Sequence, residues 1–439
     1  MAFSLHGVHV PHRKNTADKP AARIETPKVV TIPMSMHIGS PARPVVKAGD
    51  LVKIGTLIAE AVGTVSAPIY ASVSGKVKAV SDFLLSNGNT TLAVVIESDG
   101  ENAIDENIVP PVVNSQEELI DAIRTSGIVG LGGAGFPTHI KHNVEPEHIE
   151  ALIINGAECE PYITSDALTM TTRADDMEYA LNALIEHLDV EKIIIGIEDN
   201  KKNAIAEMKK LASRVKGMEV KVLPTLYPQG GEKVLVYTTT GKVIPEGKLP
   251  IDVGCIVLNC TTLASIGSYL KTGMPLVEKC VTVDGGSVKN PQNVIAPIGT
   301  PMSDLFDFCG GFKESPAEVL YGGPMMGIGV PDISAPILKN TNAILALTEK
   351  ESALPKTTAC IRCGSCTNSC PFGLAPVAIT KAYNNKDAEA LIKASVNSCM
   401  ECGCCSFVCP ANRPLVQTNK LAKAFLREEQ MKEAAKKNG

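Results

Sequence analysis

Residues 129–141, VGLGGAGFPTHIK, carry four glycines within six positions. Three of them, Gly130, Gly132 and Gly135, match the pattern G-x-G-x-x-G, which marks a dinucleotide site when it lies between a strand and a helix. The same glycines could instead form a different anion-binding loop or a plain turn. The sequence on either side of the stretch has to decide between these interpretations.

The flanking sequence argues against a dinucleotide-binding turn. Ser115 begins a pattern typical of a capped helix, and that helix is predicted to stop at Gly127. Only two residues then remain before the first glycine, too few for the strand that a Rossmann turn requires. After the loop, Pro137 and Pro146 bracket a stretch that is too short for a crossover helix. Another kind of anion cradle, or a plain turn, remains.

The residues after the loop alternate between strand and helix patterns. Short runs rich in β-branched residues predict strands, and longer stretches with helical spacing predict helices. The predicted strands are residues 151–155, 192–198 and 219–223, and the predicted helices are residues 173–188 and 201–215. This alternation predicts an α/β domain with a mainly parallel sheet.

Two further regions are predicted to be rich in strands. Residues 29–97 are short strand-like runs separated by glycine turns, and VKAGDLVKIGTLIAE (residues 46–60) resembles barrel-sandwich domains of the biotinyl and lipoyl type. The modified lysine that those domains carry at a hairpin tip is missing, so this region is predicted to be scaffold. Residues 251–347 return to short strands with glycine-rich turns and predict a small α+β module of β-grasp type.

The composition argues against two classes of protein. The chain has 42 Lys and Arg against 47 Asp and Glu, a net charge of −5, and no Trp. Neither the electrostatic attraction nor the base stacking that nucleic-acid binding requires is therefore expected. No apolar run approaches the ~18–20 residues that span a bilayer, so no transmembrane segment of its own is expected. The N-terminal stretch also lacks the apolar core of a signal peptide.

The strongest chemical signal is a doubled cysteine motif. Nine of the fourteen cysteines lie between Cys360 and Cys409, in two runs of the form C-x2-C-x2-C-x3-C-P. This doubled run is the signature of a two-cluster [4Fe–4S] ferredoxin module, in which the fourth cysteine of each run ligates the other cluster. The first predicted ligand set is Cys360, Cys363, Cys366 and Cys409, and the second is Cys399, Cys402, Cys405 and Cys370.

The alternative for these cysteines is structural zinc held by C-x-x-C pairs. Zinc requires neither the third C-x-x-C step nor the closing Cys-Pro, so clusters are favoured. Cys404 does not belong to the repeat and is expected to be a bystander beside the second set. The five other cysteines are expected to be small buried apolar residues.

Several stretches resemble one flavoprotein family. GLGGAGFPTHIK resembles the flavin loop in the NADH-oxidising flavoprotein subunit of respiratory complex I, and NGAECEP (155–161), QGGEK (229–233) and LNCTT (258–262) match that family in order. There, glycine amides and the loop lysine cradle FMN, as backbone N–H groups do at other anion sites. The resemblance implies cofactor-binding roles for Gly130, Gly132, Gly133, Gly135, Phe136, Lys141, Asn155, Glu158, Glu160, Gly231, Glu232, Asn259 and Thr262.

The resemblance also implies how NAD(H) is bound. Phe136 would stack on the adenine, while Glu160 and Glu232 would contact the dinucleotide. Two departures affect these contacts: Leu131 stands where complex I usually has arginine, and Gly231-Glu232 replaces a pair of glutamates. No catalytic side chain is expected, because the hydride passes between NAD(H) and FMN directly.

Over nearly its whole length the chain resembles the RnfC family, whose members belong to the Rnf complex, an ion-pumping ferredoxin:NAD oxidoreductase. The complex I flavoprotein has a single cluster, so the doubled cysteine motif favours Rnf. The resemblance implies a multidomain α/β fold of five consecutive units. They are an N-terminal arm (1–28), a barrel-sandwich β domain (29–110), a Rossmann-like α/β FMN domain (111–248), a β-grasp module of SLBB type (249–347) and a helical two-cluster ferredoxin domain (348–439).

The expected function is electron transfer between NAD(H), FMN and two [4Fe–4S] clusters. The resemblance implies partners in a membrane complex, namely a ferredoxin-like subunit and integral membrane subunits, and a peripheral place on the cytoplasmic face of the membrane. Ion pumping would belong to those partners. Two alternatives remain open: a cobalamin reductase of the type found with bacterial microcompartments, and a non-catalytic iron–sulfur relay subunit.

Overall fold

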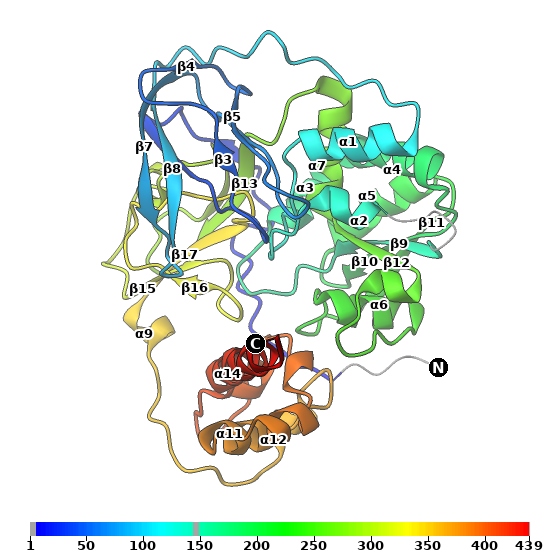
Figure 1. The fold of residues 1–439 in the computed structure, drawn as a ribbon, viewed down its shortest axis with the longest axis vertical. Helices are drawn as coiled ribbons and strands as arrows, with labels where there is room; N and C mark the ends of the chain where they lie inside the picture. Colours follow the sequence, from blue (N-terminus) through cyan, green and yellow to red (C-terminus); the bar gives the residue numbers. More distant parts are fainter. Residues whose placement is uncertain (1–5, 144–148, 439) are drawn as a thin grey trace.

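The computed structural model describes residues 6–143 and 149–438, so Pro146 lies outside the described residues. Figure 1 shows three lobes. Two contain the sheets, and the third is a helical lobe built from residues after 360. The fold is mixed α/β, as predicted.

The predicted α/β domain contains a four-stranded parallel sheet with the strand order β11-β10-β9-β12. Every residue of β10 is buried, as expected for a parallel strand covered on both faces. The strands are β9 (Ala151–Gly156), β10 (Ile193–Glu198), β11 (Met218–Leu223) and β12 (Cys255–Asn259). The helices are α1 (Gln116–Thr125), α2 (Thr138–His142), α3 (Ser165–Thr172), α4 (Ala174–Leu188), α5 (Lys202–Ala212), α6 (Glu232–Thr240) and α7 (Cys260–Thr272), and Pro250–Val253 form a 3-10 turn.

The predicted elements of this domain are confirmed to within a few residues. The helix before the glycine loop is α1, and α2 after the loop has only five residues, so the loop lacks the strand and long helix of a Rossmann turn. The boundary predicted at 248/249 is wrong. β12 and α7 complete the parallel sheet and its covering layer, because β12 pairs with β9 along its whole length.

The N-terminal β domain consists of two facing sheets, one of four strands and one of three. Ile32, Ile58, Val77 and Ile96 are fully buried in their shared core. The first sheet contains β2 (Val29–Pro33), β4 (Leu51–Val52), β7 (Gly75–Leu84) and β8 (Thr90–Ser98). The second contains β3 (Arg43–Pro44), β5 (Leu57–Glu60) and β6 (Ile69–Tyr70).

The β-grasp region forms a six-stranded mixed sheet with its own core around Phe306 and Ile344. One edge strand of this sheet comes from the N-terminal arm. The strands are β1 (Ala22–Arg23), β13 (Glu278–Asp284), β14 (Gln292–Pro297), β15 (Glu318–Tyr321), β16 (Ile328–Gly329) and β17 (Ala343–Leu347). Two short helices accompany them, α8 (Met302–Phe308) and α9 (Glu349–Ser352).

The cysteine-rich region is a small helical lobe, which an extended segment joins to α9 (Figure 1). Its core contains Ile379, Leu391, Val396 and Leu426. The helices are α10 (Ser365–Asn368), α11 (Pro376–Asn384), α12 (Ala388–Lys393), α13 (Cys404–Phe407) and α14 (Leu415–Asn438), and Val396–Ser398 form a 3-10 turn.

The N-terminal arm binds these lobes together and is not a free extension. Val8 and Tyr227 exchange two backbone hydrogen bonds of 2.8 and 3.0 Å. The Tyr162 N–H donates to the carbonyl of His12 (2.9 Å), and the His6 side chain lies 2.9 Å from the carbonyl of Asn368 in the helical lobe. The arm therefore contacts the parallel-sheet domain, the β-grasp sheet and the cysteine lobe in turn.

Candidate functional site

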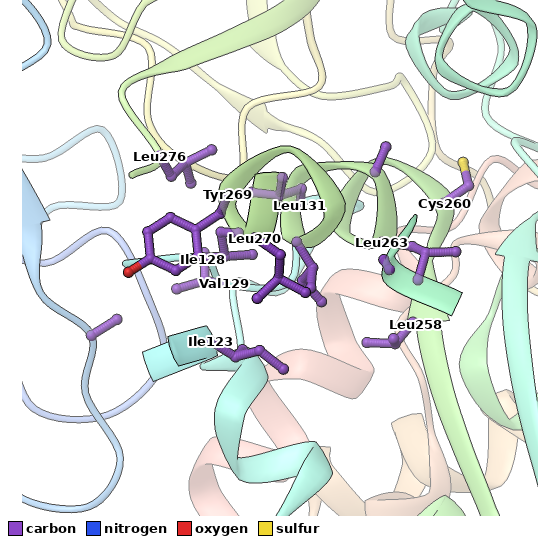
Figure 2. Packing of buried hydrophobic residues seen from close by; sticks show 14 of the residues in the cluster. Ile123, Ile128, Val129, Leu131, Leu258, Cys260, Leu263, Tyr269, Leu270 and Leu276 are labelled. Atoms are coloured by element: carbon purple, nitrogen blue, oxygen red, sulfur yellow. The ribbon is translucent and has the colours of Figure 1, made fainter. Parts of the chain in front are cut away.

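The glycine loop is anchored at its base by a buried leucine and short backbone contacts. The Gly130 N–H donates to the Phe136 carbonyl (2.8 Å), and Val129 forms a bridge with Pro137. Leu131 is 1% exposed, and Figure 2 shows it among the apolar side chains around α7. Leu131 thus holds the loop in place, and its side chain has no access to a dinucleotide.

The tip of the loop presents backbone N–H groups to an open space. Gly132, Gly133 and Ala134 are exposed. Within the described residues, the N–H groups of Gly132 and Gly133 have no hydrogen-bond partner. A Cβ on Gly133 would meet nothing within 4 Å. Unpaired N–H groups on a glycine turn are the donors that an anion such as a phosphate group requires.

The four sequence stretches that resemble the flavoprotein family meet at the carboxyl edge of the parallel sheet. Asn155 at the end of β9 is the register partner of Asn259 at the end of β12. The Asn155 amide donates to the Gly230 carbonyl (2.9 Å), and Thr262 Oγ1 accepts a hydrogen bond from the Leu131 N–H (2.9 Å). Ligands of open α/β sheets bind at this edge.

Lys141 and Glu232 form an ion pair at this edge. Their Nζ and Oε1 atoms are 2.6 Å apart, and Nζ also donates to the Val257 carbonyl (3.1 Å). The two side chains are 28% and 40% exposed, so both reach solvent. The predicted FMN lysine and a predicted dinucleotide acid are therefore direct partners.

Asn259 holds the sheet edge, α7 and the loop together. Its Oδ1 caps α7 by accepting from the N–H groups of Thr261 and Thr262 (3.0 and 3.1 Å), and its Nδ2 donates to Asp166 (2.7 Å). A Cβ on Gly132 would lie only 2.7 Å from this Nδ2. Only glycine lets the loop approach the capping asparagine so closely.

The two glutamates of the NGAECEP stretch are engaged differently. Glu158 is buried, its Oε1 accepts from the Asp166 N–H (2.8 Å), and its Oε2 has no partner among the described residues; burial raises its pKa. Both carboxylate oxygens of Glu160 accept from the backbone N–H groups of Met325 and Met326 (3.1 and 2.9 Å). Burial raises the pKa of Glu160 to about 7. In this arrangement Glu160 joins the β-grasp loop, and its contact with a dinucleotide stays a prediction.

Two buried lysines near the site were not predicted. Lys279 of β13 is 4% exposed and donates to the Leu131 carbonyl (2.9 Å), and burial lowers its pKa to about 8. Lys14 of the arm donates to the carbonyls of Glu158 (3.0 Å) and Glu160 (2.8 Å). Both act on backbone carbonyls of distant segments, for which the local sequence carries no signal.

The cysteines line two separate cavities in the helical lobe. One, of about 340 Å³, has Cys370, Cys399, Cys402 and Cys405 in its wall, and Cys404 lies beside them. The other, of about 670 Å³, has Cys360, Cys363, Cys366 and Cys409 in its wall. Each cavity thus joins three cysteines of one motif to the fourth of the other, as in the predicted sets. All eight thiols are free, so the donor set that a [4Fe–4S] cluster requires is present.

The cavity of the second set faces the parallel-sheet domain. The Tyr227 hydroxyl donates to the Cys402 carbonyl (2.7 Å), and a Cβ on Gly231 would lie 2.3 Å from the Met400 methyl carbon. Gly231 directly precedes α6 and Glu232, which binds Lys141. The second cysteine set and the flavin-loop site therefore lie on the two sides of one contact.

Family models match four consecutive parts of the chain. They are the RnfC barrel sandwich hybrid domain (residues 3–101), the Nuo51 FMN-binding domain (123–268), the SLBB domain (280–329) and the 4Fe-4S dicluster domain (354–410). These matches confirm the predicted fold class and favour two [4Fe–4S] clusters over zinc. The chain is therefore a multidomain electron-transfer protein with FMN and two [4Fe–4S] clusters as cofactors.

Curated relatives, all RnfC proteins, identify the family. The RnfC protein of the Na(+)-translocating ferredoxin:NAD(+) oxidoreductase complex of Acetobacterium woodii is 42% identical over 382 residues, which is 85% of this chain and 86% of the relative. Its counterpart in the proton-translocating complex of Clostridium ljungdahlii is 44% identical, over 84% of this chain and 82% of the relative. The counterpart in the ion-translocating oxidoreductase complex of Rhodobacter capsulatus is 40% identical over 98% and 84%. The chain belongs to this family, the RnfC proteins of the Rnf complexes.

Solved structures show the same fold at lower identity. An NAD+-reducing [NiFe]-hydrogenase in the H2-reduced state matches with a TM-score of 0.50 and 16% identity, over 71% of this chain and 61% of that chain. Within the described residues, no helix has the length and apolar character needed to cross a membrane.

Proposed function

We propose that this chain is the NAD(H)-reacting subunit of a membrane-bound, ion-translocating ferredoxin:NAD+ oxidoreductase. It would exchange a hydride with NAD(H) at FMN and pass single electrons through two [4Fe–4S] clusters to partner subunits. The relatives carry this activity in their names, and the family models cover the cofactor domains in the required order. The observation that carries the proposal is the contact between Gly231 and Met400, because it joins the flavin-loop site to a cysteine set.

Bound FMN supplies the conversion between two-electron and one-electron transfer, and the protein contributes binding, orientation and electrostatics. The unpaired N–H groups of Gly132 and Gly133 would bind the FMN phosphate or ring oxygens. Lys141 would add a positive charge at the sheet edge. Asn155 and Asn259 would orient the isoalloxazine from the carboxyl ends of the two central strands.

The remaining predicted residues would serve the dinucleotide and the clusters. Phe136 is half-buried at the end of the loop and would stack on the adenine. Glu232 would contact NAD(H) once Lys141 has turned toward FMN. Cys360, Cys363, Cys366 and Cys409 would bind one cluster, and Cys399, Cys402, Cys405 and Cys370 the other, as their separate cavities support.

The chain would act as a peripheral subunit of its membrane complex. Its partners would be a ferredoxin-like subunit and integral membrane subunits, and ion translocation would reside in the latter. We propose the cytoplasmic face of the membrane as its location, because NAD(H) and ferredoxin are cytoplasmic electron carriers.

A test uses the purified chain, reconstituted anaerobically with iron, sulfide and FMN. On addition of NADH, flavin bleaching followed by loss of cluster absorbance is expected. A chain with intact clusters whose flavin does not respond to NADH would contradict the proposal. Fast NADH-dependent reduction of a corrinoid, without association to membrane subunits, would favour the cobalamin reductase instead.

A further inference from the structure

The two cysteine cavities differ in what covers them. The cavity of the second set lies against the parallel-sheet domain and the β-grasp loop: Cys402 accepts a hydrogen bond from Tyr227, and a Cβ on Gly403 would lie 3.1 Å from the Met325 carbonyl. In the first set, by contrast, Cys360 and Cys363 are exposed. The second cluster would therefore face the flavin, and the first would face outward.

The rim of the outward cavity is apolar. Ile361 and Val377 line it and are 67% and 40% exposed. Exposed aliphatic side chains beside a redox centre are typical of a surface that a partner covers transiently. We call Ile361, Arg362, Val377 and Arg413 the outer rim.

The outer rim also carries uncompensated positive charge. Arg362 and Arg413 line the cavity, no Asp or Glu lines it, and neither arginine forms an ion pair within the described residues. The surrounding segment 348–439 has 13 Lys and Arg against 8 Asp and Glu, whereas the whole chain has 42 against 47. A basic region on an otherwise acidic chain selects partners of the opposite charge.

We propose that the outer rim docks an acidic protein that carries a one-electron centre. This inference rests on the proposed function and names the partner chemistry of its electron exit. In the NADH-oxidising direction, each transfer oxidises the cluster bound by the first cysteine set by one electron and reduces the carrier by one electron. Two transfers balance one NADH, and the reverse flow reduces NAD+.

The test is a double charge reversal, Arg362→Glu with Arg413→Glu, in the reconstituted full-length chain. The matched control is Lys202→Glu with Lys209→Glu on the exposed face of α5, which changes the net charge equally but lies in the parallel-sheet domain. The probe is a purified acidic ferredoxin with two [4Fe–4S] clusters. Its dissociation constant is measured at several salt concentrations, and flavin and cluster reduction by NADH is followed separately.

The rim variant is expected to bind the ferredoxin at least tenfold more weakly and with a smaller salt dependence, while the control stays within twofold of the unmodified chain. Reduction of the internal flavin and clusters by NADH is expected to be unchanged in both. Equal weakening by both variants, or none by the rim variant, overturns the docking proposal. An unmodified chain that reacts with NADH but does not bind the ferredoxin also overturns it, and leaves the proposed function intact. If NADH fails to reduce the flavin in the unmodified chain, the proposed function itself fails.

Discussion

Replacing Lys141 by methionine tests whether this side chain serves FMN. Methionine keeps much of the length of lysine and removes only the ammonium group. In the structure the ammonium is bound by Glu232 and by the Val257 carbonyl, and it is 28% exposed, so it can turn to an incoming phosphate without crossing the core. A hydrogen bond to a charged group contributes about 1.5–3 kcal/mol, which corresponds to a loss of roughly 10- to 150-fold in FMN affinity.

The assay is the quenching of FMN fluorescence by the flavin-free, cluster-containing chain. Glu232→Gln is the matched variant, because it breaks the same ion pair but leaves the lysine charge free for FMN. We expect this variant to bind FMN as well as or better than the unmodified chain. If Lys141→Met binds FMN within threefold of the unmodified chain, Lys141 serves only as a partner for Glu232, and the predicted role is wrong.

Three further predictions concern the structure around the site. Gly132→Ala should lower the melting temperature of the flavin-free chain, because the added Cβ would displace the Asn259 cap, worth about 1 kcal/mol, whereas Gly133→Ala, whose Cβ meets nothing within 4 Å, should not; equal melting of both variants would contradict this. Lys14→Met should increase amide exchange over residues 158–163, because the carbonyls of Glu158 and Glu160 lose a buried donor, and unchanged exchange would show that Lys14 does not position this segment. Glu160→Gln should raise the melting temperature relative to the unmodified chain more at pH 8 than at pH 5. Burial raises the folded-state pKa of Glu160 to about 7, above its usual 4.5, so its contribution to stability is lost as the pH rises between these values, and the amide does not titrate. A pH-independent difference would show that Glu160 is not held in the neutral form.

The local sequence predicted the elements of the parallel-sheet domain well. KIIIGIE became the fully buried strand β10, because a continuous β-branched run is suited to a strand covered on both faces. The helix that starts after Ser115 was also predicted, since its cap is a local interaction: Ser115 accepts from the Glu118 N–H. Helix α3 was missed, because SDALTMTT contains three threonines and no helical apolar spacing.

Long-range pairing was less predictable. Nothing in the residues of β12 indicates that it pairs with β9, about one hundred residues earlier, and the domain boundary was therefore misplaced. The arm was expected to be extended, which it is, but its contacts with Tyr227 and Tyr162 depend on segments far along the chain. Lys14 and Lys279 were missed for the same reason.

The candidate site was predicted as far as the family motifs reach. The four resembling stretches meet at one sheet edge, and the two cavities are lined by the two predicted cysteine sets. The roles of the individual residues toward FMN and NAD(H) stay predictions. The burial of Leu131 gives a physical reason for one departure from the complex I pattern, since this position anchors the loop in the core.

The most direct test of the account is an anaerobic NADH titration of the reconstituted chain, with the two clusters distinguished by electron paramagnetic resonance. It is carried out on the unmodified chain, on Cys399→Ala with Cys402→Ala, and on Cys360→Ala with Cys363→Ala. The account predicts that loss of the second set stops electrons at the flavin. Loss of the first set should still allow reduction of the second cluster. Reduction of the first cluster by NADH in the chain that lacks the second would contradict the proposed route.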